Sequence, residues 1–244
     1  MPENNIFNLD KSRLSRVLVP NYLPALIATF VVLVAGILAD HQNDIISEAR
    51  MRSLVANELG PIRSKLENSI NGNIQLVRGL IGTIATEPEM RQQRFAELAQ
   101  SIFTERSHLR NLAAAPDLVV SMVYPVEGNE KAIGLDYRTN ENQRASAMRV
   151  MQTGKLVLAG PVDLVQGGRG LIGRFPVKTE VGGEKRFWGL LSAVIDIDRL
   201  YRDSGLASPE LDIEIAIAGR DGLGRHGSVF FGDSTIFRKG PVEM

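Results

Sequence analysis

The chain has 244 residues, of which 44% are hydrophobic and 23% charged, a composition typical of globular proteins. Its 28 basic and 28 acidic residues balance, so the net charge gives no reason to expect nucleic-acid binding. Cysteine is absent and the three histidines lie far apart, which excludes disulfides, thiolate metal sites and a histidine cluster with ligand spacing.

An uncharged segment near the N-terminus, residues 17–39, predicts a transmembrane helix. At ~1.5 Å per residue it would extend roughly 34 Å, enough to cross a bilayer core of ~30 Å. Basic residues precede it and acidic residues follow it, which places residues 1–16 in the cytoplasm and the rest of the chain outside. We therefore expect a single anchor in the inner membrane of the cell.

Two other interpretations of this segment compete with a retained anchor. A cleaved signal peptide usually has a shorter apolar region and small residues at its cleavage site, whereas Leu38 is a large residue in the nearest candidate site. A buried core helix rarely contains so long an uncharged run. The sequence favours the anchor over both.

The pattern of residues 40–107 predicts a helical stalk followed by a second helix. Apolar residues recur about every 3.7 positions along the stalk, which is typical of one helix face. Gly60-Pro61 is expected to kink or break the stalk, and Thr86 with Glu89 matches a capping box for the second helix. The apolar stripe fits two interpretations, a homodimer seam or packing against the same domain. Its members are Met51, Val55, Leu59, Ile62, Leu66, Ile70, Ile74, Val77, Ile81 and Ile84.

Beyond the stalk the apolar pattern changes to the period of strands, which predicts an α+β fold with antiparallel sheets. The expected strands are 109–115, 118–124, 131–136, 155–159, 162–166, 171–178 and 187–196, with a final hairpin of 212–218 and 228–231. Helices are expected at 141–153, between Asn140 as N-cap and Gly154 as C-cap, and at 197–204.

A series of short motifs between residues 109 and 205 resembles the CHASE domain, an extracellular sensory module of histidine kinases and cyclases. In chain order they are Arg110-Asn111-Leu112-Ala113, Pro116-Asp117, Val123-Tyr124-Pro125, Ile133-Gly134-Leu135-Asp136-Tyr137, Arg144, Thr153-Gly154, Gly160-Pro161, Leu164-Val165-Gln166-Gly167-Gly168, Phe175-Pro176-Val177, Trp188-Gly189 and Val194-Ile195-Asp196. The resemblance implies a long helix followed by tandem PAS-like sheets, of which the membrane-distal one holds a small-molecule pocket.

The resemblance also implies a division of the chain. Residues 108–196 would form the distal PAS-like subdomain, and residues 197–244 would begin a membrane-proximal one. The last strands look incomplete, so we expect a longer protein with a second membrane helix and a cytoplasmic kinase or diguanylate cyclase as its output.

The resemblance directs attention to Asp136, which stands where plant members use an acid to hold their ligand. A carboxylate at a strand end can accept charged hydrogen bonds from an N–H-rich ligand, although a local turn is the common role of such a residue. Six further residues are candidate ligand contacts, with packing in the sheet or the core as their alternative role. They are Tyr137, Leu158, Ala159, Tyr124, Phe175 and Arg169.

Signs of catalysis are missing from the sequence. Residues 168–173 match a dinucleotide-binding pattern, but a strand rather than a helix is expected after them, so we interpret them as a hairpin turn. We therefore expect neither a cofactor nor an enzyme in this chain. A small-molecule sensor is the leading hypothesis, and a dimerisation or protein-interaction module without a ligand is the alternative.

Overall fold

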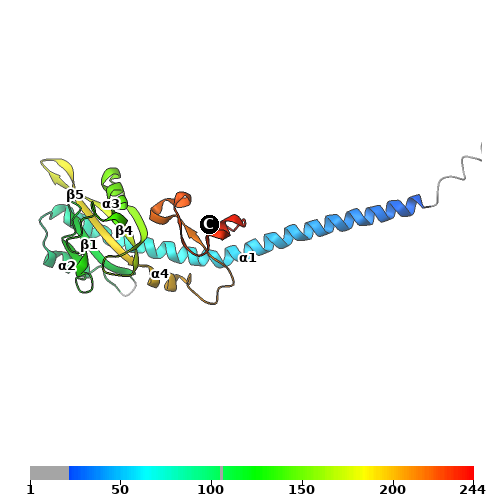
Figure 1. Ribbon diagram of the computed structural model, residues 1–244, viewed down its shortest axis with the longest axis horizontal. Coiled ribbons are helices and arrows are strands. Elements are labelled where there is room, and N and C mark those ends of the chain that lie inside the picture. Colours follow the sequence, from blue (N-terminus) through cyan, green and yellow to red (C-terminus); the bar gives the residue numbers. More distant parts are fainter. Residues whose placement is uncertain (1–21, 105–106) are drawn as a thin grey trace, which may run out of the picture. The chain divides into compact units, whose positions relative to one another are not determined.

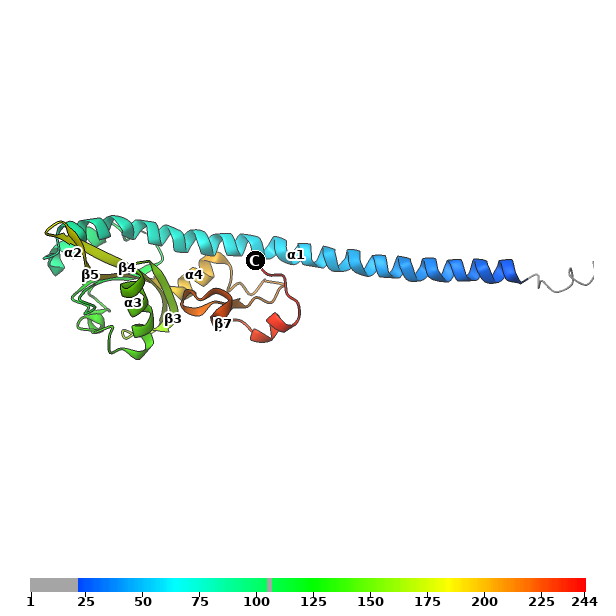
Figure 2. The same ribbon diagram turned by 90° about the horizontal axis from the view of Figure 1, so that it is seen from above.

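The computed structural model describes residues 22–104 and 107–244, with no statement about the side chain of Arg225 (Figures 1 and 2). The chain divides into two compact units, 1–54 and 55–244, which we describe separately. Helix α1, Leu23–Thr86, contributes to both units.

The N-terminal unit contains the apolar half of α1. An 18-residue window there has a mean hydropathy of 2.3, and none of the window is buried, so by length and composition this helix could cross a membrane. A buried core helix is therefore not what residues 17–39 form, as far as they are described. The basic flank that set the predicted orientation lies outside the described residues.

Pro61 lies inside α1, which continues through it without a break. Of the two expected effects, a kink or a break, the break was wrong. Proline removes one backbone N–H donor from the helix but leaves the bonds of the flanking turns in place. Directly after it Ile62 is only 7% exposed, so packing holds the helix at this point.

The C-terminal half of the apolar stripe on α1 packs against the chain's own domain. Ile62, Ile74, Val77 and Ile84 are buried in a core cluster with residues of the sheet. The interpretation of the stripe as intramolecular packing is thus confirmed for residues 62–84. Burying such a side chain stabilises a fold by about 1.5–3 kcal/mol.

Five antiparallel strands form the main sheet, in the order β2-β1-β5-β4-β3. Their bounds are Leu109–Pro116 (β1), Met122–Tyr124 (β2), Val157–Asp163 (β3), Arg169–Val181 (β4) and Glu184–Asp196 (β5). Helix α1 runs along one face of this sheet, and α3, Glu141–Thr153, lies on the other (Figure 2). The predicted α+β class with antiparallel sheet is confirmed.

Alternation along the strands assigns each side chain to one of these two faces. On β4, Leu171, Phe175 and Val177 belong to the core under α1. Arg174 and Ile172 belong to the opposite face by the same alternation. This separation decides which predicted site residues can meet.

The two helices with strong capping signals form as predicted. The Asn140 side chain accepts a hydrogen bond from the backbone N–H of Gln143, and Gly154 closes α3 in the left-handed conformation. Helix α4 is Ile197–Ser204, with Asp196 as its N-cap.

Helix α2, Gln92–Gln100, is shorter than expected and begins after Arg91, which makes no side-chain cap. The predicted capping box was wrong because Thr86 ends α1, where its hydroxyl donates to the carbonyl oxygen of Thr83 at 3.0 Å.

Residues 118–136 differ most from expectation. The predicted strand 131–136 is a 3-10 turn, Glu130–Ala132, followed by a loop. The backbone of this loop is hydrogen-bonded to residues 118–120, where Val120 N donates to Leu135 O at 3.0 Å. Of the predicted strands 118–124 and 131–136, only β2 and one isolated bridge remain.

The predicted strands 155–159 and 162–166 merge into β3. The last strands, Ile217–Ala218 (β6) and Val229–Phe231 (β7), form the expected hairpin, although β6 is much shorter than the predicted strand 212–218. Two 3-10 turns, Arg220–Gly222 and Gly224–His226, lie between the strands, and a third, Ser234–Arg238, follows β7.

Candidate functional site

A fully buried arginine, Arg174, lies in the middle of β4 on the face covered by α3. The strand is otherwise apolar at this level, with Ile172 and Phe175 beside it. Long charged side chains are almost never fully buried unless they are paired. The position of Arg174 is therefore the feature of this face that most needs a functional explanation.

Three neutral oxygens surround the guanidinium. Nε donates to Ser146 Oγ at 3.0 Å, Nη1 to Ser192 Oγ at 3.2 Å, and Nη2 to Gln143 Oε1 at 2.6 Å. The ring of Tyr137 covers its face, with 4.3 Å between Cζ and the ring centroid. The Tyr137 hydroxyl in turn lies 3.2 Å from Ser192 Oγ.

No carboxylate in the described part of the chain forms an ion pair with Arg174. Arginine stays protonated in proteins, so its positive charge is buried without a counter-charge. Removing an ion from water costs several kcal/mol even after relaxation, and neutral hydroxyl and amide oxygens offset only part of that cost. The local electrostatics favour an anion.

Small and apolar side chains make up the rest of this cluster between the sheet and α3. They are Ala113, Ala115, Leu118, Val120, Val123, Ala132, Ala147, Val150, Val157 and Leu190. These side chains surround the polar group with apolar atoms and exclude water from it. We call the residues of this cluster together with Arg174, Gln143, Ser146 and Ser192 the α3-face cluster.

Two predicted site residues lie in or beside the α3-face cluster. Tyr137 is 3% exposed and stacks on Arg174 as described. Asp136 lies at the surface next to it and binds the Arg138 guanidinium at 2.9 Å. The side chain of Arg138, and then its backbone N–H, hold the pKa of Asp136 below its ordinary value, so this carboxylate is ionised and already has a cation.

The other predicted site residues do not join this cluster. Phe175 is in the core under α1, where Tyr124 and Leu158 also pack. Ala159 belongs to a third cluster with Ile172 and Val194. Arg169 is exposed at the start of β4.

Sequence reasoning missed Arg174, although a signal was available. A single arginine interrupts the apolar run of β4, and it alternates with residues of the α1 face. Its partners come from α3 and β5, at sequence separations of 31, 28 and 18 residues, so no local motif connects them.

The comparison with protein families gives a match to the CHASE domain over residues 81–230, more than half of the chain. The chain belongs to the CHASE-domain family. The matched range begins in the last turns of α1 and ends in β7, so it contains the sheet, α3 and every residue of the α3-face cluster. A CHASE domain is an extracellular sensory domain, and the predicted sensor function is confirmed at that level.

Solved structures similar to this CHASE domain share little sequence with it. An extracellular ligand-binding receptor from Desulfohalobium retbaense aligns at 18% identity and a TM-score of 0.48, over 79% of this chain and 34% of the receptor. The ligand-binding domain of the Pseudomonas aeruginosa amino-acid chemoreceptor PctC, in complex with GABA, aligns at 16% identity and 0.45, over 59% and 65%. The chain thus spans about a third of the first structure's length. A comparison with curated proteins gives no match.

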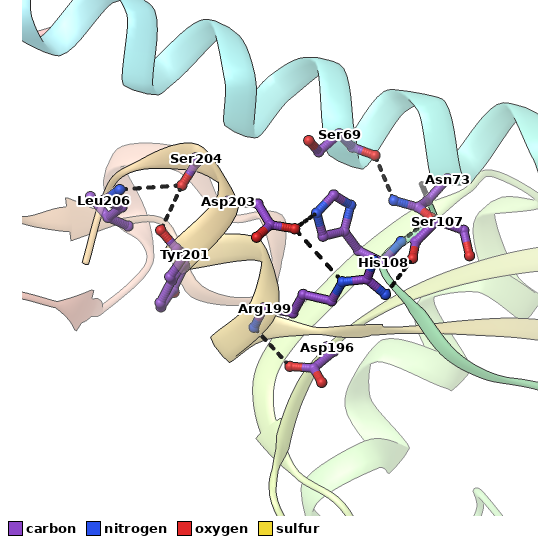
Figure 3. Close-up of polar contacts among 10 residues, drawn as sticks. All are labelled: Ser69, Asn73, Ser107, His108, Asp196, Arg199, Tyr201, Asp203, Ser204 and Leu206. Atoms are coloured by element: carbon purple, nitrogen blue, oxygen red, sulfur yellow. Dashed lines mark hydrogen bonds and ion pairs between the residues drawn. The ribbon is translucent and has the colours of Figure 1, made fainter. Parts of the chain in front are cut away.

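A second polar group in the CHASE domain connects α1, the start of β1 and α4 (Figure 3). Asn73 on α1 accepts the backbone N–H of His108 at 3.0 Å, and its amide donates to Ser69 O at 2.7 Å. His108 Nε2 lies 3.0 Å from Asp203 Oδ2 of α4. Arg199 of α4 donates to the carbonyl of Ser107 at 3.1 Å. Through His108, these bonds connect the stalk helix to the start of β1 and to α4, which follows β5.

We expect Asn73→Leu to lower the free energy of unfolding of the CHASE domain by about 1–3 kcal/mol, because the buried N–H of His108 loses its acceptor. Thermal unfolding of the full chain measures this change. The matched control is Asn71→Leu, the same substitution at an exposed position of α1, for which we expect less than about 0.5 kcal/mol. Equal losses in the two variants would contradict a specific role for Asn73.

Tyr201 of α4 is buried with its ring edge against Phe231 of β7, 5.0 Å between centroids. Its hydroxyl has no hydrogen-bond partner among the described residues, and burial raises the pKa of Tyr201 to about 12. Since an unpaired buried hydroxyl is costly, Tyr201→Phe is expected to raise the free energy of unfolding by up to about 1 kcal/mol. A measured loss of stability in thermal denaturation would show that the hydroxyl has a partner.

Proposed function

We propose that this chain is the extracytoplasmic sensing part of a membrane-anchored receptor that binds a small molecule in the α3-face cluster. The observation that carries this proposal is the group of buried polar side chains around Arg174 in otherwise apolar surroundings. Buried polar groups of this kind give a ligand its orientation while the apolar walls supply most of the contact area. The site takes Asp136 and Tyr137 from the sequence prediction and adds Arg174, Gln143, Ser146 and Ser192.

The proposed position in the cell follows from the same chain. The apolar half of α1 anchors the protein in the inner membrane, with residues 1–16 in the cytoplasm and the sheets outside. Residues 108–196 are the membrane-distal PAS-like subdomain, and residues 197–244 begin the proximal one. The output, a cytoplasmic kinase or cyclase, lies in the rest of the receptor.

Helix α3 provides a route from the site to the β6–β7 hairpin. Its first turns carry Gln143 and Ser146, and one turn further on Arg149 donates to the backbone carbonyl of Asp221. The Asp221 carboxylate accepts the N–H of Gly160 on β3 at 2.7 Å. A ligand that moves α3 would therefore change the contacts of the 220–222 turn. Binding would favour one of two packings of α3 against the β6–β7 hairpin.

A homodimer is the proposed assembly, and the exposed apolar residues of the N-terminal half of α1 support it. Ile45, Ile46, Met51 and Leu54 are 52–62% exposed, unlike the residues of the stripe beyond position 62. The chain has no cysteine, so oxidation of a Leu54→Cys variant in membranes tests this assembly directly. A disulfide-linked dimer is expected, and a Leu76→Cys variant that cross-links more efficiently would place the contact elsewhere.

The ligand-binding function is tested with the full chain in detergent micelles, by thermal denaturation against a panel of acids, amides, amines, sugars and nucleosides. At least one compound should raise Tm. The shift should vanish in Tyr137→Leu, which removes the ring that stacks on Arg174. It should persist in Tyr124→Leu, the same substitution in the core under α1.

A panel in which no compound raises Tm, together with native mass spectra that contain no co-purified small molecule, would contradict the sensor function. A dimerisation or protein-interaction module would then be the better interpretation.

A further inference from the structure

Arg174 is the only buried arginine, lysine, aspartate or glutamate among the residues whose burial the structure describes. Every other charged side chain there is at least partly exposed to solvent. Water therefore screens those charges, while the charge of Arg174 acts at close range in a region of low dielectric constant. A ligand group that reached the α3-face cluster would therefore experience the positive charge of Arg174 almost unscreened.

Two N–H donors of the guanidinium have no acceptor among the described residues. An arginine side chain has five N–H donors in a planar fork, and three of them have acceptors among the described residues. All three acceptors are neutral. A carboxylate matches the fork with two oxygens, and its charge-assisted bonds are roughly twice as strong as bonds to neutral oxygens.

We propose that Arg174 is the counter-charge for a carboxylate of the sensed ligand, and that this ligand is a small monocarboxylate with an apolar body. The proposal rests on the sensor function proposed above and names its ligand class. One buried guanidinium balances one negative charge. The alanine, valine and leucine side chains around it are apolar, so they match an apolar ligand body, whereas a second charge would be left without a partner.

Neighbouring charges agree with an anion rather than a cation. Asp136, the carboxylate beside the cluster, is bound by Arg138 through three nitrogen–oxygen contacts of 2.9–3.1 Å. The same guanidinium reaches Asp117 at 3.3 Å. A cationic ligand would have to displace Arg138 from Asp136 and would also meet the positive charge of Arg174.

The ligand carboxylate would compete with Gln143 for the guanidinium. The Gln143 amide is a neutral acceptor at 2.6 Å, and it belongs to the first turn of α3. A charged acceptor in its place releases this side chain from β4. The charge of the ligand is thereby connected to α3, the helix that also contacts the 220–222 turn.

The test uses the full chain in detergent micelles and four acids, namely propionate, butyrate, benzoate and phenylacetate, each paired with its primary amide. The amide has nearly the same shape without the charge. At about 10 mM, at least one acid is expected to raise Tm by about 2 °C or more, and its amide to give no shift. Inorganic phosphate at the same concentration is a separate arm, for which no shift is expected.

Three variants assign the shift to Arg174. Arg174→Met should abolish it. If Arg174→Met does not fold, Arg174→Lys replaces it in the test. This variant keeps the charge but loses the planar fork, so it should weaken acid binding at least about tenfold. Arg186→Met is the matched control, because this arginine on β5 is exposed and pairs only with Glu184 among the described residues; it should retain the full shift.

The outcomes separate this proposal from the sensor function. An amide that shifts Tm as much as its acid, with the shift lost in Tyr137→Leu, overturns the charge assignment and leaves a sensor of neutral ligands. An acid whose effect survives in both Arg174 variants, a phosphate-only response, or no shift by any acid overturns it as well.

Discussion

Gly189→Ala should destabilise the sheet more than any conservative change at the surface, by about 3 kcal/mol or more. Gly189 on β5 has a φ of +155°, and an ideal Cβ there would lie 2.1 Å from the carbonyl oxygen of Ala115. The carbonyl oxygen belongs to the backbone and the backbone fixes the direction of a Cβ, so in these paired strands neither atom can turn away. Relief requires the separation of β1 from β5, the central strand of the sheet.

The single tryptophan of the chain, Trp188, is the neighbour of this glycine and gives a convenient fluorescence signal for unfolding. Its indole N–H donates to the carbonyl of Pro88 at 3.1 Å, so separation of the strand should alter its emission. The control is Gly72→Ala in α1, where a Cβ meets nothing within 4 Å. Alanine favours helices over glycine by about 1 kcal/mol, so this variant should gain stability. A Gly189→Ala protein with the wild-type Tm would contradict the close contact.

Ile84→Ala is expected to lower the free energy of unfolding by about 2–5 kcal/mol, because Ile84 is fully buried between α1 and the sheet. Urea denaturation of the full chain in micelles measures the loss. Leu76→Ala removes a similar side chain from the same helix, but Leu76 is 42% exposed. Its loss should stay within about 0.5 kcal/mol.

The same pair of variants examines the role of the α1 stripe. If residues 74–84 formed a dimer seam instead of the core of their own domain, the loss in Ile84→Ala would depend on protein concentration. We expect no such dependence, since Ile84 packs in the same core cluster as Phe95 and Leu191 of its own chain. A concentration-dependent loss would contradict the intramolecular packing.

The sequence determined the features that arise from local interactions. Asn140 and Gly154 set the limits of α3 because both capping groups act within one turn of the helix end. The hydropathy of α1 likewise identified a helix that could cross a membrane. The alternating pattern of the strands and the series of motifs between 109 and 205 identified a CHASE domain.

Sequence-local rules were misleading where distant packing outweighed them. Gly60-Pro61 did not break α1, since the stripe that follows it is buried against the sheet. Residues 131–136 carried a strand pattern, yet they form no strand. Their backbone is hydrogen-bonded to residues 118–120, with one isolated β-bridge.

The sequence pointed to Asp136 and Tyr137, but the centre of the candidate site, Arg174 with its partners, was decided by the tertiary structure. Strand alternation separates Arg174 from Phe175, but it does not reveal which face α3 covers. Only the folded chain brings Tyr137, Gln143 and Ser192 around the guanidinium, from the loop before α3, from α3 and from β5. A charge becomes unusual when water is excluded from it, and the exclusion of water is a property of the whole fold.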